Sequence, residues 1–159
     1  MRTLSALLRV AVLPAVLALA VAAPVAVGAA EPTTDATVVA GTGTLAAKGS
    51  GYARIAGSYV LAGSMDGGWL KVTGVTRYTI VRVTGWTSKT RFADGSLLFR
   101  GVHGNFYIAG RTIATTISSP LTRFRATGHG RAYFAGEGVY YVNGHGPFRW
   151  SDGGAHSAF

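Results

Sequence analysis

The sequence predicts an all-β protein, and three observations carry this prediction. Glycine interrupts the chain roughly every six to ten residues beyond Glu31, and a glycine inside a helix costs about 1 kcal/mol. The segments between the glycines are short and rich in Val, Ile, Thr, Tyr, Phe and Trp, which are favoured in strands. Similar segments also recur along the chain, which indicates a repeated structural unit.

The clearest repeat is a short segment that begins and ends with glycine. Its copies are GYARIAG at 51–57, GNFYIAG at 104–110 and GRAYFAG at 130–136, with a looser copy, RYTIVRVTG, that ends at Gly85. The closing glycines are therefore separated by 28, 25 and 26 residues. A shorter spacing of eight residues separates Gly41, Gly49 and Gly57, and again Gly128, Gly136 and Gly144. About three short strands with turns between them fit one long repeat.

Side chains in these segments alternate between apolar and polar, as they do in a strand with one buried face. The positions predicted to point inward are Ala53, Ile55, Val81, Val83, Phe106, Ile108, Ala132 and Phe134. A second strand of each repeat adds Leu45, Ala47, Leu70, Val72, Leu97, Phe99, Phe124 and Ala126, followed by Phe148 and Trp150. The residues between them are polar or amphipathic and are predicted to point outward.

The repeat favours a single-domain β-solenoid of about four to five coils, with three strands in each coil. Stacked coils would bury the apolar side chains in continuous columns. An antiparallel β-sandwich or barrel is the alternative, because units of eight residues also suit a meander. We expect the β-repeat domain to span residues 41–152, after a flexible leader at 31–40 and before a flexible tail at 153–159.

The first thirty residues have the layout of a secretory signal peptide. Arg2 and Arg9 are the only charged residues before Glu31, an apolar run covers residues 10–27, and small residues follow up to Ala30. Prolines interrupt the apolar run, whereas a membrane-spanning helix needs roughly 20 apolar residues in sequence. We expect cleavage after Ala30, with Ala23 as the alternative, and no transmembrane span in the mature chain. The sequence thus predicts a secreted or cell-envelope protein.

The composition limits what can stabilise this protein and what it can bind. The chain has 159 residues and no cysteine, so neither a disulfide nor a lipidated N-terminal cysteine is available. Removal of the signal peptide takes away two arginines and lowers the formal charge from +9 to +7. A charge of this size on a small domain favours anionic partners or serves solubility alone.

Three segments resemble a known group of sequences: GTGTLAAKGSGYARIAGS, FADGSLLFRG and TGHGRAYFAGEGVYYVNG. They look like an uncharacterised group of exported bacterial proteins with recurring G-x-G-x-(A/L) strands. The resemblance covers most of residues 41–150 and implies an exported β-repeat protein. It implies no activity, and no functional residue is carried over from it.

The outward positions supply the candidate binding residues, which we expect to form an Arg/Tyr face for polyanions. One predicted column contains Lys71, Arg100, Arg123, Arg125 and Arg149, and a second contains Arg54 and Arg82 beside Tyr107 and Tyr133. Arginine pairs with phosphate, sulfate and carboxylate groups through two parallel hydrogen bonds. The tyrosines offer rings that stack on sugars or bases. A solubilising cationic surface is the simpler interpretation of the same pattern.

Acidic residues and histidines give weaker candidates. Asp66 and Asp94 are 28 residues apart, so stacked repeats would bring together two carboxylates, as glycan hydrolysis requires. Each of them also precedes a glycine, however, and an Asp-Gly pair is typical of a turn. His103 and His129 occupy equivalent repeat positions, and with His145 or Asp152 they could bind Zn²⁺ or Cu²⁺. No known metal-binding spacing occurs, and no nucleophile motif is present. We predict no enzyme activity, no cofactor and no metal.

The function that the sequence favours is therefore that of a non-catalytic module, secreted or associated with the envelope, that binds anionic surface polymers. Anionic polysaccharides and cell-wall polymers are the expected partners, and no specific nucleic acid is expected. A self-assembling structural protein of the envelope and a hydrolase or lyase that acts on polysaccharide remain the alternatives.

Overall fold

The computed structural model describes residues 42–151 and 153–159, and this part of the chain is all-β. Its strands are β1 (Gly43–Asp66), β2 (Trp69–Thr73), β3 (Ile80–Val83), β4 (Ser88–Arg91), β5 (Leu97–Arg100), β6 (His103–Val142), β7 (His145–Arg149) and β8 (Ala155–Ala158). Across these residues, no helix is long and apolar enough to cross a membrane. The predicted signal peptide at 1–30 and leader at 31–40 lie outside the described residues.

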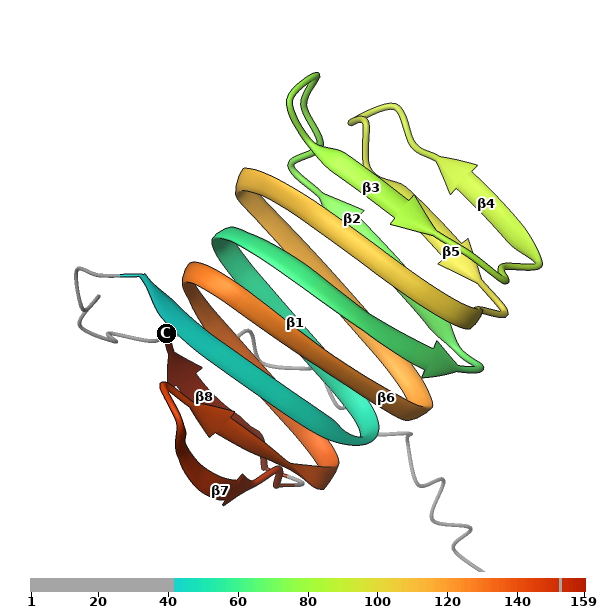
Figure 1. The fold of residues 1–159 in the computed structure, drawn as a ribbon. Helices are drawn as coiled ribbons and strands as arrows, with labels where there is room; N and C mark the ends of the chain where they lie inside the picture. The colour runs from blue at the N-terminus through green and yellow to red at the C-terminus, as the bar shows by residue number, and fades with distance from the viewer. Residues whose placement is uncertain (1–41, 152) are drawn as a thin grey trace, which may run out of the picture. The chain divides into compact units, whose positions relative to one another are not determined.

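All of these strands belong to one open antiparallel sheet, in which β1 and β6 wind around each other (Figure 1). Strand β1 lies between two successive passes of β6. Leu45, for example, pairs with Ala126 on one side and with Val142 on the other, two residues that are sixteen apart in sequence. One pass of β6 around the fold takes sixteen residues here, and the other pairings of β1 give passes of seventeen residues at Ala53 and eighteen at Leu61.

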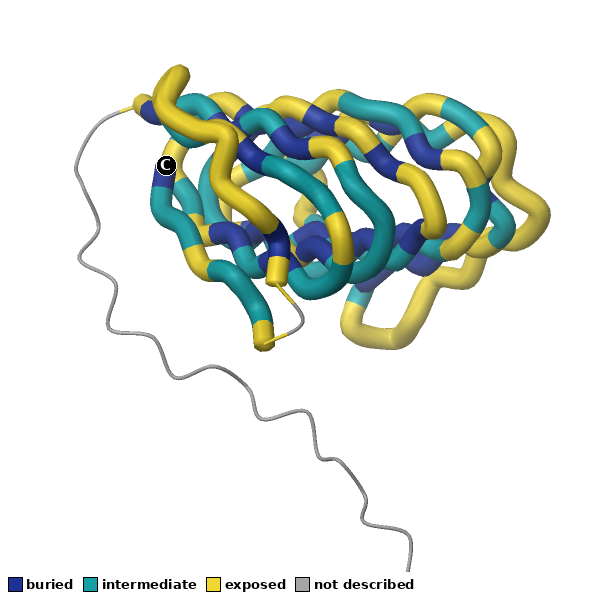
Figure 2. Tube along the Cα trace, turned by 90° about the horizontal axis from the view of Figure 1, so that it is seen from below, coloured by how far each residue is buried: buried dark blue, intermediate teal, exposed yellow. Residues whose placement is uncertain are grey.

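The winding folds the sheet over itself into two layers with the core between them, and buried residues occur along both layers in Figure 2. The first layer contains 43–49 and 59–66 of β1 and 103–110, 122–128 and 138–142 of β6, flanked by β3 and β7. The second layer contains 51–57 of β1 and 113–119 and 130–136 of β6, flanked by β2, β5 and β4 on one side and by β8 on the other.

Paired glycines form the corners at which the chain crosses from one layer to the other. Gly51 pairs with Gly136, and Gly57 pairs with Gly130. A Cβ atom on Gly57 would lie 2.2 Å from the carbonyl oxygen of His129, so no side chain fits at this close approach. The eight-residue spacing of glycine in the sequence is thus half of one sixteen-residue pass.

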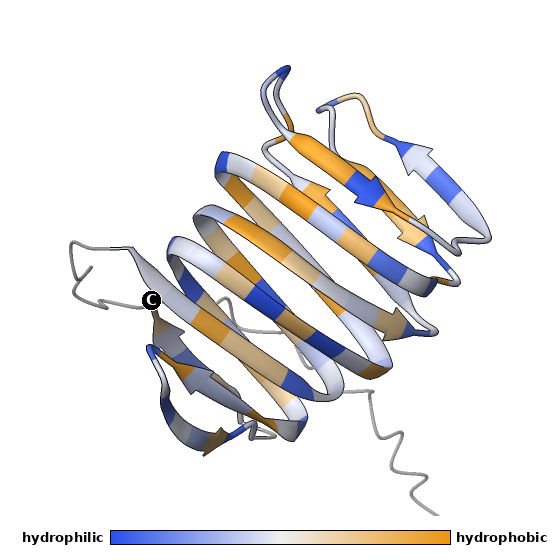
Figure 3. Cartoon of the chain, in the orientation of Figure 1, coloured by the Kyte–Doolittle hydropathy of each residue, from blue (hydrophilic) through white to orange (hydrophobic). Residues whose placement is uncertain are grey.

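The core confirms the predicted alternation of side chains, and hydrophobic and hydrophilic residues alternate along much of β1 and β6 in Figure 3. All the predicted inward residues are buried except Val81 and Val83, which pack against the core from its periphery, and Phe148. The aromatic rings at one end of the core stack closely: the Phe134 ring centroid lies 4.7 Å from that of Tyr140 and 5.1 Å from that of Trp150.

Phe148 corrects the prediction that it lies inside. It pairs with the buried Tyr140 and faces the same side of the sheet, but β7 is at the edge of the first layer. No further strand covers the ring, which is 45% exposed.

The structure also differs from the predicted architecture. The β-solenoid of three-strand coils is not confirmed: neighbouring strands are antiparallel, and pairing recurs every sixteen to eighteen residues rather than about every 26. The sheet also does not close into a barrel. The stretch 153–159, expected to be a flexible tail, contributes β8 to the sheet and buries Phe159, whose ring centroid lies 6.5 Å from that of Tyr59.

Candidate functional site

The structure divides the predicted binding residues between the outer faces of the two layers. Arg82, Tyr107, Arg123, Arg125 and Arg149 lie on segments of the first layer, and Arg54, Lys71, Arg100 and Tyr133 lie on segments of the second. Neither predicted column stays together. Most of the predicted set is exposed, and only Lys71 and Tyr133 are half-buried.

The division follows from the glycine corners. Along β1 the alternation continues past each glycine corner, so a side chain that points outward before the corner is followed by others that point outward after it. The layer changes at each corner, however, and these outward side chains then belong to opposite faces. Arg54 in β1 illustrates this, because it pairs with Tyr133 and Thr116 in the second layer while Lys48 of the same strand pairs with Arg123 in the first.

On the first layer, cross-strand pairing aligns cationic and aromatic residues in a row across the strands. The successive partners in this row are Tyr141, Ala46, Arg125, Ala62, Tyr107 and Arg82. Adjacent strands are about 4.8 Å apart, and side chains directly opposite each other are neighbours on the face. Ala46 therefore separates Tyr141 from Arg125, and Ala62 separates Arg125 from Tyr107.

A second row runs beside the first, displaced by two residues along each strand. Its successive partners are Arg149, Val139, Lys48, Arg123, Ser64 and Asn105. Lys48 and Arg123 lie next to each other across two strands, and Arg125 is on the same face two residues from Arg123. Three cationic side chains are thus concentrated on the middle of this face.

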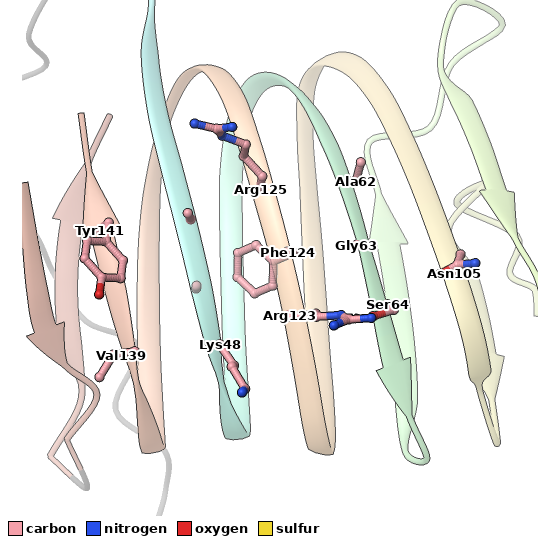
Figure 4. A pocket seen from close by; sticks show the side chains of 12 residues that line it. Lys48, Ala62, Gly63, Ser64, Asn105, Arg123, Phe124, Arg125, Val139 and Tyr141 are labelled. Carbon is pink, nitrogen blue, oxygen red and sulfur yellow. Dashed lines mark hydrogen bonds between the residues drawn. The ribbon is translucent and has the colours of Figure 1, made fainter. Parts of the chain in front are cut away.

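The two rows enclose a shallow groove of about 530 Å³, shown in Figure 4. Small residues form its floor, namely Ala46, Ala62 and Gly63, and the buried Phe124 side chain also belongs to the lining. The larger side chains that line it are Lys48, Asn105, Arg123, Arg125, Val139 and Tyr141. A groove with an apolar floor and a cationic rim suits a ligand that carries negative charge on an otherwise flat backbone.

The cationic groups of the groove have an acidic neighbour, Asp66, which lines an adjacent pocket with Lys48 and Arg123 but pairs with His103. Arg123 donates a hydrogen bond from Nε to the Ser64 hydroxyl over 3.0 Å, which orients its guanidinium group along the groove. Within 42–151 and 153–159, no carboxylate forms an ion pair with Lys48, Arg123 or Arg125. Their charges are consequently available to a ligand.

The outer face of the second layer is built differently. The Tyr52 ring contacts both Trp69 and Tyr133 edge to face, with centroids 6.5 Å and 6.0 Å apart. The Lys71 ammonium group lies 5.2 Å from the centroid of the Phe92 ring. The aromatic rings of this face therefore pack against one another, and the Lys71 ammonium group packs on the Phe92 ring.

The acidic candidates have separate partners. Asp66 Oδ1 lies 2.6 Å from His103 Nδ1 in an exposed pair. Asp94 Oδ1 accepts hydrogen bonds from the backbone N–H and the hydroxyl of Ser96, and these bonds lower the pKa of Asp94. Asp94 thus has the turn role that its Asp-Gly dipeptide suggests. The described residues contain no cluster of three or more His, Cys, Asp or Glu side chains that could hold a metal ion.

Sequence reasoning missed four polar residues of the groove: Lys48, Ser64, Asn105 and Tyr141. Lys48 follows the predicted inward Ala47, and Asn105 precedes the predicted inward Phe106, so alternation alone places both outward. Tyr141 lies two residues from Val139 in a segment outside the copies of the repeat. A search for outward residues sixteen apart, such as Arg125 and Tyr141, would have found it.

Comparison with known proteins gives no match to a family model, to a curated protein or to a solved structure.

Proposed function

We propose that this chain is a non-catalytic module that binds anionic surface polymers through the groove of the first layer. The observation that carries the proposal is the concentration of Lys48, Arg123 and Arg125 along one open groove without an acidic partner. Charge-assisted hydrogen bonds to phosphate, sulfate or carboxylate are stronger than neutral ones, and a linear polymer can engage several cations at once.

The edges of the sheet support a binding module over a self-assembling protein. Among the edge strands of the described sheet, β3, β4, β7 and β8, β4 carries Lys89 and Arg91 and β7 contains Pro147, and these residues oppose pairing with another chain. The winding of β1 and β6 is the part of the fold nearest to a solenoid. We propose that it acts as a rigid scaffold for the groove rather than as a unit of polymerisation.

The separate roles of Asp66 and Asp94 support a protein without glycosidase activity. Paired catalytic carboxylates face one scissile bond and have roughly 5–10 Å between them. Here one carboxylate pairs with His103 at the end of β1, and the other caps the turn between β4 and β5.

Retention on heparin tests the proposal, with two double variants that remove the same charge. Arg123→Ser combined with Arg125→Ser alters the groove, and Arg54→Ser combined with Arg100→Ser alters the second layer. We expect the groove variant to elute at distinctly lower salt than the wild-type protein, and the second-layer variant to elute near it. Wild-type retention itself is expected to weaken steeply with salt, because exposed charges are screened.

Two results would reject the proposal. One is retention that does not change with salt. The other is an equal shift in both double variants, because this would mean that net charge alone, without the groove, determines binding.

Export is a separate part of the proposal and has its own measurement. We propose that the chain is secreted or held at the envelope after removal of residues 1–30. The mature protein recovered from outside the cytoplasm should then begin at Glu31, which N-terminal sequencing measures directly. Recovery of the chain with Met1 intact would contradict export through a cleaved signal peptide.

A further inference from the structure

Two exposed tyrosines lie near opposite ends of the same row, Tyr141 in the lining of the groove and Tyr107 beyond it, past Ala62. Tyr141 is 41% exposed and Tyr107 is 39% exposed, although both belong to paired strands of the first layer and not to a loop. Neither ring contacts another aromatic ring within the described part of the chain. The exposed part of each ring is thus open to a ligand.

The row between these rings has the dimensions of an extended binding site. Tyr141 and Tyr107 are separated by four strand spacings, or roughly 19 Å. Arg125 is midway between them, and an alanine lies on each side of it, at Ala46 and Ala62. A polymer chain that lies across the strands would meet five side chains in turn: Tyr141, Ala46, Arg125, Ala62 and Tyr107.

Neutral polar groups line the same path. The Ser64 hydroxyl and the Asn105 amide belong to the neighbouring row, next to Arg123. Hydroxyl and amide groups both donate and accept hydrogen bonds, as the hydroxyl groups of a sugar do. A simple polyphosphate offers neither hydroxyl groups for these side chains nor an apolar face for the tyrosine rings.

We propose that the groove binds a linear polysaccharide that carries carboxylate or sulfate groups, with the polymer lying across the strands. The sugar rings pack on Tyr141 and Tyr107, and the acidic groups pair with Arg125 and Arg123. This inference rests on the proposed function and adds to it the class of polymer and its direction on the sheet.

The experiment compares three polymers on the full mature chain: alginate, inorganic polyphosphate and single-stranded DNA. The variant is Tyr107→Ser combined with Tyr141→Ser, and the matched control is Tyr78→Ser, which alters a tyrosine that is 75% exposed in the loop before β3. Two lost aromatic contacts should weaken alginate binding roughly tenfold. Binding of polyphosphate should stay within about twofold, because the cations remain. Tyr78→Ser should leave both affinities unchanged.

A second double variant excludes a loss of structure as the cause. Tyr107→Phe combined with Tyr141→Phe keeps both rings, so alginate binding should stay close to that of the wild-type protein. Thermal unfolding of each variant shows whether the sheet is intact.

The possible results separate this inference from the function on which it rests. Equal loss of alginate and polyphosphate binding in the serine variant, or no loss of either, overturns the polysaccharide assignment and leaves a general polyanion site. Tighter binding of DNA than of alginate also overturns it, because bases stack on aromatic rings as well. Failure of the wild-type protein to bind any of the three polymers at low salt would overturn the proposed function itself.

Discussion

Gly51 of β1 lies directly opposite Gly136 of β6, and both residues have positive φ angles, 124° and 116°. These are backbone conformations that residues with a side chain rarely adopt. A Cβ atom at Gly51 would also lie 2.4 Å from the Ala135 carbonyl oxygen. The pair turns two neighbouring strands at the same place and keeps the register between them, in which Gly49 pairs with Gly138 and Gly51 with Gly136.

Substitution of Gly51 by alanine should therefore destabilise the protein strongly. We expect Gly51→Ala to lower the free energy of unfolding by about 2–3 kcal/mol, from backbone strain and the clash with the facing carbonyl together. Urea denaturation measures this value. The control is Gly153→Ala, where a Cβ atom has no neighbour within 4 Å, and it should change stability by less than about 0.5 kcal/mol. Similar effects of the two substitutions would contradict the role of the corner.

Tyr59 should make stability fall at high pH. Burial raises the pKa of Tyr59 to about 12, while its hydroxyl donates to the Ile55 carbonyl oxygen and lies 2.9 Å from Thr115 Oγ1. Between about pH 10 and pH 12 the unfolded chain has released the Tyr59 proton and the folded chain keeps it. The free energy of unfolding then decreases by about 1.4 kcal/mol for each pH unit.

Urea denaturation at pH 9 and at pH 11 tests this effect in the wild-type protein and in Tyr59→Phe. The variant is less stable at pH 9, because the hydrogen bonds of the hydroxyl are lost. Its further loss of stability between the two pH values should be smaller than that of the wild-type protein. An equal loss in both proteins would assign the pH dependence to other groups.

Phe134 should be among the most sensitive positions of the core. Its side chain is fully buried and stacks on Tyr140 and Trp150, and its ring centroid also lies 6.2 Å from that of Phe124. We expect Phe134→Ala to lower the free energy of unfolding by about 3–5 kcal/mol and Phe134→Leu by less. Phe148→Ala, at an exposed ring of the edge strand, should cost less than about 1 kcal/mol. A cost for Phe148→Ala as large as that for Phe134→Ala would contradict this description of the core.

Two lysines distinguish the binding face that the structure supports from the one that the sequence predicts. Lys48 lines the groove and pairs with Arg123 across the strands, whereas Lys71 lies on the second layer over Phe92. We expect Lys48→Ser to reduce the salt concentration at which the protein elutes from heparin, and Lys71→Ser to have little effect. The reverse order would favour the predicted column and would place the ligand on the second layer.

The all-β class and the direction of nearly every core side chain could be predicted from the sequence alone. Alternation depends on local backbone geometry, because successive side chains of a strand point to opposite faces wherever that strand lies. Ile55, Ile108 and Phe134 could therefore be placed in the interior before any pairing was known. Arg54 and Arg125 could be placed outside for the same reason.

Which outward residues share a face could be known only from the fold. Arg125 lies in one row with Tyr141 and Tyr107 because β1 lies between two passes of β6, and this pairing is set by contacts between residues distant in sequence. Each glycine corner moves the chain to the opposite layer, so Arg54 is separated from Arg125 although both point outward. The apparent repeat of about 26 residues conceals passes of sixteen to eighteen residues. The direction of a side chain depends on its own strand, whereas the groove depends on which residues are paired across neighbouring strands.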